Sequence, residues 1–436
     1  MPETGTPPAS SDIVIIGGGI VGSAAAYFLA KKGAKPTLIE KGQIAGEQSG
    51  RNWGFVRQQG RDPLEIPLIR EGIEIWAGFT EALGADIEFR RTGNLAIADT
   101  EELMAIYRSW LPLAQRFGVD TRLLDSNELA KLLPAMEPRF VGGLYTPSDG
   151  QADPVKATTA IARKAAELDA TIVTNCAVRG IRAPGGVIES VETEKGIIRT
   201  PRVLVAAGSW SARLLRPLGL SLPQLVIRAT VAQTTPAAKE LTPTGIWGPS
   251  LGTRQRIDRS FNVAAGILTD YDIVLDSLRY AHLYWPNFRL NRKNFQLHLG
   301  MPMLNSIQRM FQPEAQYERQ YEKTRAWDPT PNPDLVTMAM KALGHLFPDA
   351  ANLQVARRWA GAIDVMPDAI PVLGNVDKPK GLMIATGLSG HGFAMGPIIG
   401  KQMAELAADG KTTHDIHGFR FSRFAEGAMQ GARSIL

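Results

Sequence analysis

The chain has 436 residues, of which 44% are hydrophobic, and its 48 basic and 43 acidic residues give a net charge of +5. This length predicts two domains with an ample core, and the mixed charges argue against the basic footprint of a nucleic-acid-binding protein. With one cysteine, Cys176, and no HExxH, GxSxG or Walker motif, we expect no disulfide framework, no metal site, and neither hydrolase nor P-loop ATPase chemistry.

Residues 13–41 follow the pattern of a nucleotide-binding βαβ unit. The β-branched run at 13–16 predicts a strand buried on both faces, and a helix is predicted at 20–32. Three glycines match G-x-G-x-x-G, which permits a tight turn, close approach of the backbone to a pyrophosphate, and close packing of the helix on the strand. These glycines are Gly17, Gly19 and Gly22. The N-terminus of the helix is then expected to face the phosphates.

The second predicted strand, 36–39, ends at Glu40, which lies 18 residues beyond Gly22. A carboxylate at this position can accept hydrogen bonds from both ribose hydroxyls and disfavours a 2′-phosphate. The competing interpretations are a membrane anchor, because 13–30 are uncharged, and a signal peptide. Three adjacent glycines in a run shorter than a usual span argue against the anchor, and an acid and prolines in place of a basic n-region argue against the signal peptide. We expect the first ten residues to be a disordered lead-in.

The polar, glycine-rich loop after Glu40 has no periodicity, which is typical of a disordered connector or of a functional segment held against a ligand. Because the βαβ unit places the start of this loop beside the nucleotide, we favour the functional interpretation. Its hydroxyl, backbone and guanidinium donors for a pyrophosphate are Ser49, Gly50, Arg51 and Asn52. An amphipathic helix is predicted next, at 64–83.

The middle of the chain alternates between helix and strand patterns. We expect a strand at 91–98, a helix at 101–117, a turn-rich stretch at 134–149, and a helix at 153–168 that starts with an aspartate N-cap and a proline. A meander of short strands is predicted at 170–178, 186–192 and 196–199. The next strand begins at 203 and runs into small residues that let the backbone approach a ligand closely, namely Ala206, Ala207 and Gly208.

A second sheet is predicted from the strand patterns at 225–233, 245–247, 253–257 and 261–265. Residues 275–327 differ, because they are helical in pattern and rich in aromatic residues and arginine. We expect a solvated segment that packs between subunits, since charge-bearing stretches usually lie on the surface. The alternative is a docking surface for a membrane, an electron acceptor or a second subunit.

The C-terminal stretch repeats the arrangement of strand, glycine turn and helix. A strand is predicted at 382–385, a glycine-rich turn at 386–393, and a helix from there to about residue 408. Such a turn brings backbone N–H groups and a helix N-terminus to a ligand. Simple tight packing of the glycines is the alternative interpretation.

Taken together, these stretches resemble the flavoenzymes grouped with D-amino-acid oxidase, glycine oxidase, sarcosine oxidase and D-amino-acid dehydrogenase. The matching stretches are the βαβ unit, the SGRN loop, GGLYTPSDGQADP at 142–154, VLVAAGSWS at 203–211 and the C-terminal turn. The resemblance covers nearly the whole chain apart from about 275–330. It implies an α/β fold with a discontinuous Rossmann-like FAD-binding domain and a second, α+β substrate domain built on a mixed or antiparallel sheet. The implied FAD-binding domain is 10–85, 150–222 and 350–436, and the implied substrate domain is 86–149 and 223–349, with 275–330 as a helical insertion.

In this family FAD lies across the carboxyl edge of the sheet, and the C-terminal turn sits beneath the flavin ring, where a helix dipole stabilises developing negative charge. The cofactor-binding residues that the resemblance implies are Gly17, Gly19, Ile20, Val21, Gly22, Glu40, Lys41, Ser49, Gly50, Arg51, Asn52, Trp53, Ala177, Val178, Ala206, Ala207, Gly208, Trp210, Gly361, Gly387, Gly390, His391, Gly392 and Phe393. Sarcosine-oxidase-like members attach FAD through a cysteine, but the matching region here has Gly361, so we expect a noncovalent flavin. We interpret Cys176 as a buried small hydrophobe.

Two carboxylate anchors of the family are missing. The lysine of sarcosine-oxidase-like members is Ala394 here, and an arginine of D-amino-acid dehydrogenase-like members is replaced by Ile363, followed by Asp364. Either another arginine holds a substrate carboxylate, or a cationic or polar amine meets Asp364. The substrate-binding candidates are Arg57, Arg228, Arg254, Arg256 and Asp364, and the catalytic candidates are Arg57, Asp364 and His391. The alternatives are ion pairs for the arginines, a packed ring for His391, and a backbone cap for Asp364.

The resemblance implies oxidation of the carbon–nitrogen bond of an amino acid or related secondary amine by hydride transfer to flavin N5, giving an imine that hydrolyses to a carbonyl compound. Oxygen, a quinone or a protein are the candidate electron acceptors. A lysine near the flavin in sarcosine oxidases is matched by Asn262, which favours a dehydrogenase. The alternative is a flavin subunit of a hetero-oligomeric or membrane-associated amine, opine or proline-type dehydrogenase, and an NAD-binding module ranks third. We expect no nucleic-acid partner, either a homo-oligomer or peripheral membrane contact through 275–330, and a cytoplasmic location that extends to the inner membrane face.

Overall fold

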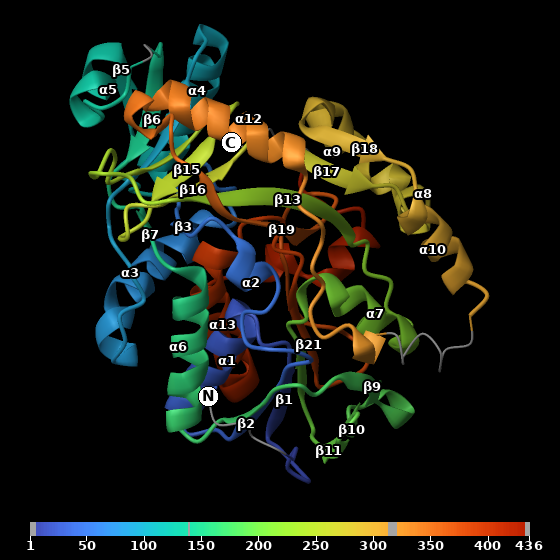
Figure 1. The fold of residues 1–436 in the computed structure, drawn as a ribbon. Coiled ribbons are helices and arrows are strands. Elements are labelled where there is room, and N and C mark those ends of the chain that lie inside the picture. Colours follow the sequence, from blue (N-terminus) through green and yellow to red (C-terminus); the bar gives the residue numbers. More distant parts are fainter. Residues whose placement is uncertain (1–5, 138–139, 313–320, 432–436) are drawn as a thin grey trace.

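A computed structural model describes residues 6–137, 140–312 and 321–431 of the chain (Figure 1). The first five residues of the expected lead-in therefore lie outside the described residues. In the described ranges, no helix is long and apolar enough to cross a membrane.

The βαβ pattern forms the centre of a six-stranded sheet. The strand β1 (Ile13–Ile16) pairs in parallel with β2 (Pro36–Ile39) on one side and β12 (Val203–Val205) on the other. All four residues of β1 are buried, as its β-branched run predicts for a strand covered on both faces. The order of the sheet is β20 (Val372–Asn375), β21 (Leu382–Thr386), β12, β1, β2 and β8 (Thr171–Val173), with β20 antiparallel to β21 and the other pairs parallel.

Each face of this sheet has its own apolar core. Ile13 and Ile15 pack into the core under the helices, whereas Val14 and Ile16 pack into the core under the meander, because successive strand residues point to opposite faces. The helices are α1 (Ile20–Lys31), α13 (Gly392–Asp409), α6 (Pro154–Glu167) and α3 (Ile66–Leu83). The meander is β9 (Val178–Arg182), β10 (Ser190–Thr193) and β11 (Gly196–Arg199), followed in the chain by α7 (Ser211–Leu215). The Asp153 carboxylate accepts the Lys156 N–H at 2.9 Å, which confirms the predicted N-cap of α6.

The second sheet has ten strands and lies above the first in Figure 1. Its order is β18 (Phe295–His298), β17 (Thr269–Asp272), β13 (Leu225–Thr234), β16 (Phe261–Ala264), β15 (Gly252–Gln255), β14 (Gly245–Trp247), β4 (Asn94–Ala98), β6 (Gly142–Thr146) and β5 (Arg122–Asp125), and β19 (Val355–Val365) also pairs with β13. The helices that accompany it are α4 (Glu101–Arg116), α5 (Ser126–Leu132) and α12 (Pro333–Leu346).

Three predictions differ from the structure. The strand predicted at 170–178 as the first of the meander is β8, which pairs with β2 in the six-stranded sheet, and the meander begins with β9 instead. The stretch 134–149, predicted to be rich in turns, contains β6, because glycines in this strand leave room for the tightly packed neighbours β4 and β5. The strand β19, assigned to the FAD-binding part of the chain, instead pairs along its length with β13 of the second sheet. It thereby joins the two parts, since the chain passes from β19 directly to β20 of the first sheet.

The segment predicted to be helical at 275–327 contains α8 (Leu275–Arg279), α9 (Ala281–Asn291) and α10 (Met301–Arg309). It also contains the strand β18, which extends the edge of the second sheet through β17. Figure 1 shows these elements, in gold, at one side of the molecule. Residues 313–320 lie outside the described residues.

Candidate active site

A cavity of about 620 Å³ lies where the carboxyl ends of β1, β2, β12 and β21 meet β13 and β19 of the second sheet. This is the edge at which open α/β sheets bind ligands. Most of the residues that we expected to hold a cofactor line this cavity, including Gly17, Gly19, Glu40, Lys41, Val178, Ala206, Gly361, Gly390 and His391. Four expected residues do not line it, namely Gly22, Gly50, Ala177 and Gly387.

The glycines after β1 are required by close backbone contacts. A Cβ atom on Gly17, which has φ +113°, would lie 2.4 Å from the Ala206 carbonyl oxygen. A Cβ atom on Gly22 would lie 2.0 Å from the Gly17 carbonyl oxygen. Gly22 therefore allows α1 to pack on the turn, while Gly17 and Gly19 bring bare backbone to the cavity.

Glu40 lies at the end of β2 with both carboxylate oxygens fixed. Its Oε2 atom accepts the Gly18 N–H at 2.7 Å and its Oε1 atom accepts the Gly42 N–H at 2.7 Å. Burial raises the pKa of this carboxyl group, and the two backbone N–H groups act to lower it. Each oxygen keeps a further lone pair, so the arrangement is compatible with ribose hydroxyls as additional donors.

The SGRN loop forms the short helix α2 (Gln48–Arg51) and braces the turn after β1. The Ser49 hydroxyl accepts the Ile20 N–H at 2.9 Å, so it satisfies a free N–H at the start of α1. Arg51 donates to the Ala360 carbonyl at 3.1 Å and pairs with Asp328. These side chains thus link the loop to the protein around the cavity, although Ser49 and Arg51 also line it.

Lys41 tests whether the cavity fits a nucleotide. Its Nζ atom is buried without a hydrogen-bond partner, 3.6 Å from the centre of the Trp210 ring and 3.9 Å from a Glu47 carboxylate oxygen. Burial lowers the pKa of Lys41 to about 8. A buried ammonium with unused donors is costly unless an acceptor reaches it, and a nucleotide offers such acceptors. The surroundings of Lys41 therefore fit a bound nucleotide.

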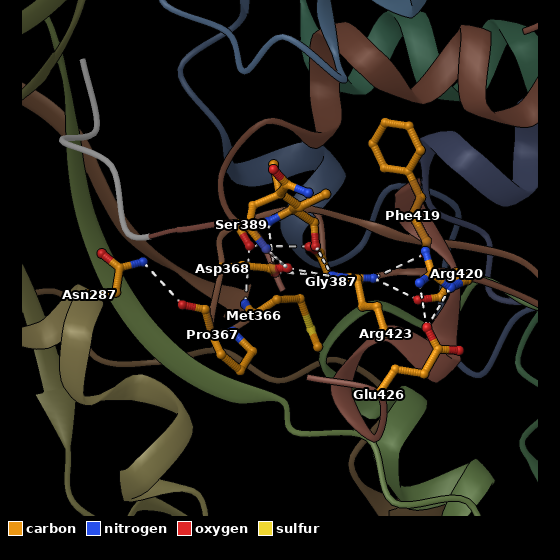
Figure 2. A network of polar contacts seen from close by, with 12 residues as sticks. Asn287, Met366, Pro367, Asp368, Gly387, Ser389, Phe419, Arg420, Arg423 and Glu426 are labelled. Atoms are coloured by element: carbon orange, nitrogen blue, oxygen red, sulfur yellow. Dashed lines mark hydrogen bonds and ion pairs between the residues drawn. The ribbon is translucent and has the colours of Figure 1, made fainter. Parts of the chain in front are cut away.

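At the opposite end of the cavity, the turn after β21 is held by side-chain bonds (Figure 2). The Ser389 hydroxyl accepts the Met366 N–H and donates to the Gly387 carbonyl, both at 3.1 Å. Asp368 and Arg423 form a fully buried bidentate ion pair next to this turn, with distances of 2.9 and 3.0 Å. These bonds hold the turn to the segment 366–368 and so fix its position relative to β19.

Asp364 caps the same turn. Its Oδ2 atom accepts hydrogen bonds from the Gly387 N–H and Gln224 Nε2, both at 2.8 Å, and from the Thr386 hydroxyl at 3.3 Å. Its side chain is 1% exposed. This favours the backbone cap over contact with a substrate, because the protein already supplies the donors that the carboxylate needs.

A charged cluster lies beside the turn, under β14. It contains Arg57, Arg61, Glu65 and His391. The Arg57 guanidinium lies over the Trp247 ring, with its central carbon 4.8 Å from the ring centre, and Glu65 Oε1 lies 3.1 Å from His391 Nδ1. Arg57, Arg61 and His391 line the cavity, so two cations and an imidazole face its contents.

Burial and mutual charge set the protonation of this cluster. Burial, reinforced by Arg61, lowers the pKa of Arg57 to about 9, which leaves it charged at neutral pH. Burial and Arg61 also lower the pKa of His391, so its ring is neutral near pH 7. Burial acts to raise the pKa of Glu65, but His391 and Arg61 outweigh it and lower this pKa. Glu65 therefore accepts the His391 Nδ1–H, which leaves Nε2 with a lone pair.

The other three candidate arginines do not line the cavity. Arg228 pairs with Asp272 at 2.8 Å, Arg256 pairs with Asp153 at 3.0 Å, and Arg254 donates to the Trp53 carbonyl. Substrate binding by Arg228, Arg254 and Arg256 is thus corrected to structural pairing, because strand alternation directs these side chains to other partners. Asn262 is buried and its amide lies 3.4 Å from the Trp53 carbonyl oxygen.

Sequence reasoning missed Arg61, Glu65 and Trp247 as parts of the site. Arg61 and Glu65 follow Arg57 in the chain at intervals of four residues, a spacing that the glycine and proline between them hid, because a helix is not expected there. Trp247 gave no signal, since its strand reaches the cavity only through the pairing of β14 with β4.

Comparison with known proteins gives a consistent result. The model of the FAD dependent oxidoreductase family, DAO, matches residues 12–406. The mitochondrial sarcosine dehydrogenase of Mus musculus is 24% identical over 98% of this chain and 43% of that protein, so the chain spans about two fifths of that relative. The β subunit of sarcosine oxidase from Rhodobacter capsulatus is 24% identical over 93% of this chain and 86% of that protein.

Among solved structures, the L-amino acid deaminase of Proteus myxofaciens in complex with anthranilate superposes with a TM-score of 0.90. It is 28% identical in sequence, and the match covers 97% of this chain and 95% of that chain.

Proposed function

Because this chain belongs to the DAO family of FAD-dependent oxidoreductases, whose members act on amines and amino acids, we propose that it oxidises the carbon–nitrogen bond of an amino acid whose carboxylate is held by Arg57. One observation carries this proposal: Arg57 lines the cavity, lies over Trp247, and belongs to the same cluster as His391 of the glycine turn. Arginine suits this role, because its planar fork matches a carboxylate.

Residues at both ends of the cavity would hold FAD. The turn at Gly17 and Gly19 with the start of α1 would take the pyrophosphate, Glu40 the ribose, and the Val178 region the adenine. The turn at Gly390 and the N-terminus of α13 would support the flavin ring. FAD, when bound, supplies the hydride acceptor for the carbon–nitrogen bond, and hydrolysis of the resulting imine gives the carbonyl product.

The protein's own charges favour the reactive form of the substrate. Arg57 and Arg61 attract a carboxylate and disfavour a protonated amine beside them, so they lower the pKa of that amine. A neutral amine is required, because its nitrogen lone pair assists loss of hydride. His391 adds no positive charge near pH 7, and its bond to Glu65 holds it in place.

We infer noncovalent attachment of FAD. Gly361 lines the cavity, and a Cβ atom there would meet Arg51 rather than a reactive group. The only cysteine, Cys176, is buried at the nucleotide end with its pKa raised by burial, which disfavours a reactive thiolate. Acid precipitation of the purified protein should release all yellow colour into the supernatant, and colour retained in the pellet would contradict this inference.

The electron acceptor is proposed to be a quinone or a protein, with oxygen as the alternative. Asn262, in place of a lysine, supports this choice. A second candidate function is a flavin subunit of a larger dehydrogenase, which is supported by the similarity to a sarcosine oxidase subunit and by the exposed apolar segment described below. Full turnover by the isolated chain with an artificial acceptor would count against that candidate. We propose a cytoplasmic location.

The proposal is tested by anaerobic reduction of the flavin. Purified flavin-loaded protein is mixed with D- and L-amino acids, with secondary amino acids such as proline and sarcosine, and with the matching amines that lack the carboxylate. We expect bleaching of the flavin by one group of carboxylates and at least a hundredfold slower bleaching by its decarboxylated analogues, since a charge-assisted bidentate pair would be lost. Equal rates with both sets would overturn the role of Arg57, and protein that never carries flavin would overturn the function.

A further inference from the structure

The segment 275–312 exposes an unusual amount of apolar surface. Ten of the seventeen large hydrophobic side chains that are exposed among the described residues lie in it: Leu278, Trp285, Leu290, Leu297, Leu299, Met301, Leu304, Ile307, Met310 and Phe311. Phe311 is 82% exposed and Leu299 is 75% exposed. Exposed apolar side chains gathered in one segment mark an interaction site, because single exposed apolar residues would be scattered over the molecule.

The helix α10 exposes its apolar side chains to solvent. Its half-buried positions are Met303 and Ser306, and the Ser306 hydroxyl accepts the Leu275 N–H at 3.1 Å. Met301, Leu304 and Ile307 follow at intervals of three residues and are exposed. An amphipathic helix normally buries its apolar stripe, whereas among the described residues this stripe is left open to a partner.

The charge around this surface identifies the partner. Residues 275–312 carry five basic residues, Arg279, Arg289, Arg292, Lys293 and Arg309, and one acidic residue, Asp276. The five basic side chains are exposed, while Asp276 is already paired with Arg216. Apolar side chains together with a one-sided positive charge suit the interface of a membrane that contains anionic lipids.

The same segment connects to the cavity. Tyr284, Trp285 and Phe288 of α9 line it, and Asn287 donates to the Pro367 carbonyl at 3.3 Å, next to the turn that caps the substrate end (Figure 2). Any partner that binds the exposed side of α9 would therefore lie next to the cavity.

We propose that the exposed side chains of residues 278–311, which we term the docking face, bind peripherally to the surface of a bilayer that contains anionic lipid. Apolar side chains of α10 enter the headgroup region, and the basic residues contact the lipid phosphates. The chain rests on the membrane through this face without spanning it.

Vesicle flotation with the flavin-loaded full chain tests the proposal. We expect binding to vesicles of phosphatidylcholine and phosphatidylglycerol, weaker binding at high salt, and little binding to phosphatidylcholine alone. The double variant Leu304→Glu/Phe311→Glu should lower the partition coefficient by roughly tenfold or more, because two apolar anchors are lost. Neither residue lines the cavity, so the flavin content should be unchanged. The variant Arg292→Glu/Lys293→Glu should lower binding to anionic vesicles by about tenfold or more.

Matched controls separate the docking face from general surface effects. Ile106→Glu/Ile197→Glu alters two exposed apolar residues on α4 and β11, and Lys131→Glu/Lys341→Glu alters two exposed lysines on α5 and α12. Both controls should bind like the unaltered chain. Absence of binding to anionic vesicles overturns the proposal, as does equal loss in the controls. If light scattering shows that Leu304→Glu/Phe311→Glu dissociates an oligomer while no vesicle is bound, the docking face joins copies of the chain, and the proposal is also overturned.

Discussion

The two ends of the cavity are built by different means. At the nucleotide end, the turn after β1 is bare backbone, because a Cβ atom on Gly17 would lie 2.4 Å from the Ala206 carbonyl oxygen, and Glu40 and Lys41 are the charged side chains beside it. At the substrate end, side chains make the surface, since Arg57 and His391 meet from segments more than three hundred residues apart. Ligand binding at the nucleotide end therefore depends mainly on the space that glycines leave. Ligand binding at the substrate end, where Arg57 and His391 lie, depends mainly on charge.

The largest effect is expected from filling space at the nucleotide end. In Gly22→Val the new Cβ atom would lie 2.0 Å from the Gly17 carbonyl oxygen, so the turn or α1 must move. We expect protein without bound flavin or no folded protein at all, measured by flavin absorbance and thermal unfolding. In the control Gly78→Ala, on α3, nothing lies within 4 Å of the new Cβ atom, and flavin content should not change. Normal flavin content in Gly22→Val would show that this end tolerates side chains.

Removal of charge at the substrate end is expected to have the next largest effect. Arg57→Met should lower kcat/KM for the carboxylate substrate by about a hundredfold or more, since charge-assisted bonds to the carboxylate are lost. Flavin reduction by the decarboxylated amine should change much less. Arg228→Met, which removes an arginine outside the cavity, is the control and should keep kcat/KM within about threefold. Similar losses for both substrates would show that Arg57 supports the fold instead.

The pH dependence of stability probes the charge that surrounds Arg57. Burial raises the pKa of Asp149 to about 7, although its oxygens accept the Gln58 and Gln59 N–H groups. Because the folded pKa lies above the ordinary value, this group's contribution to stability is fully present below pH 3.8 and is lost as the pH rises through 7. From pH 4 to 7.5, the unaltered chain should lose about 1–3 kcal/mol of unfolding free energy relative to Asp149→Asn. A constant difference across this range would contradict the raised pKa.

The smallest effect is expected from Lys41, whose ammonium group lies at the nucleotide end. Lys41→Met should raise the Kd for FAD by roughly fivefold to thirtyfold, about 1–2 kcal/mol, because a buried ammonium would no longer donate to the nucleotide. Lys41→Arg should restore part of the affinity, and Lys35→Met, on the exposed surface, should leave the Kd unchanged. An effect of Lys41→Met as large as that of Gly22→Val would erase the distinction between the two ends.

Much of the fold could be predicted because its signals are local. The β-branched run at 13–16, the proline-led helix at 153–168 and the strand before the glycine turn at 386–393 all follow from neighbouring residues, and the structure contains each of them within a few residues of the expected ends. The strand at 142–146 was missed because glycines weaken a strand pattern, and β19 was misplaced because pairing across the chain leaves no local trace.

By itself the sequence determined the nucleotide end, because its strand, glycine turn, helix and acid follow one another within a single βαβ unit, and it determined the family through motifs spread over the chain. Only the tertiary structure decided the substrate end. It separated Arg57 from three other arginines, bonded Asp364 to the backbone of the glycine turn, and brought Trp247 and Arg61 to the cavity. The physical reason is that a glycine turn forms from residues adjacent in sequence. The partner of a charged side chain depends instead on how distant segments pack together.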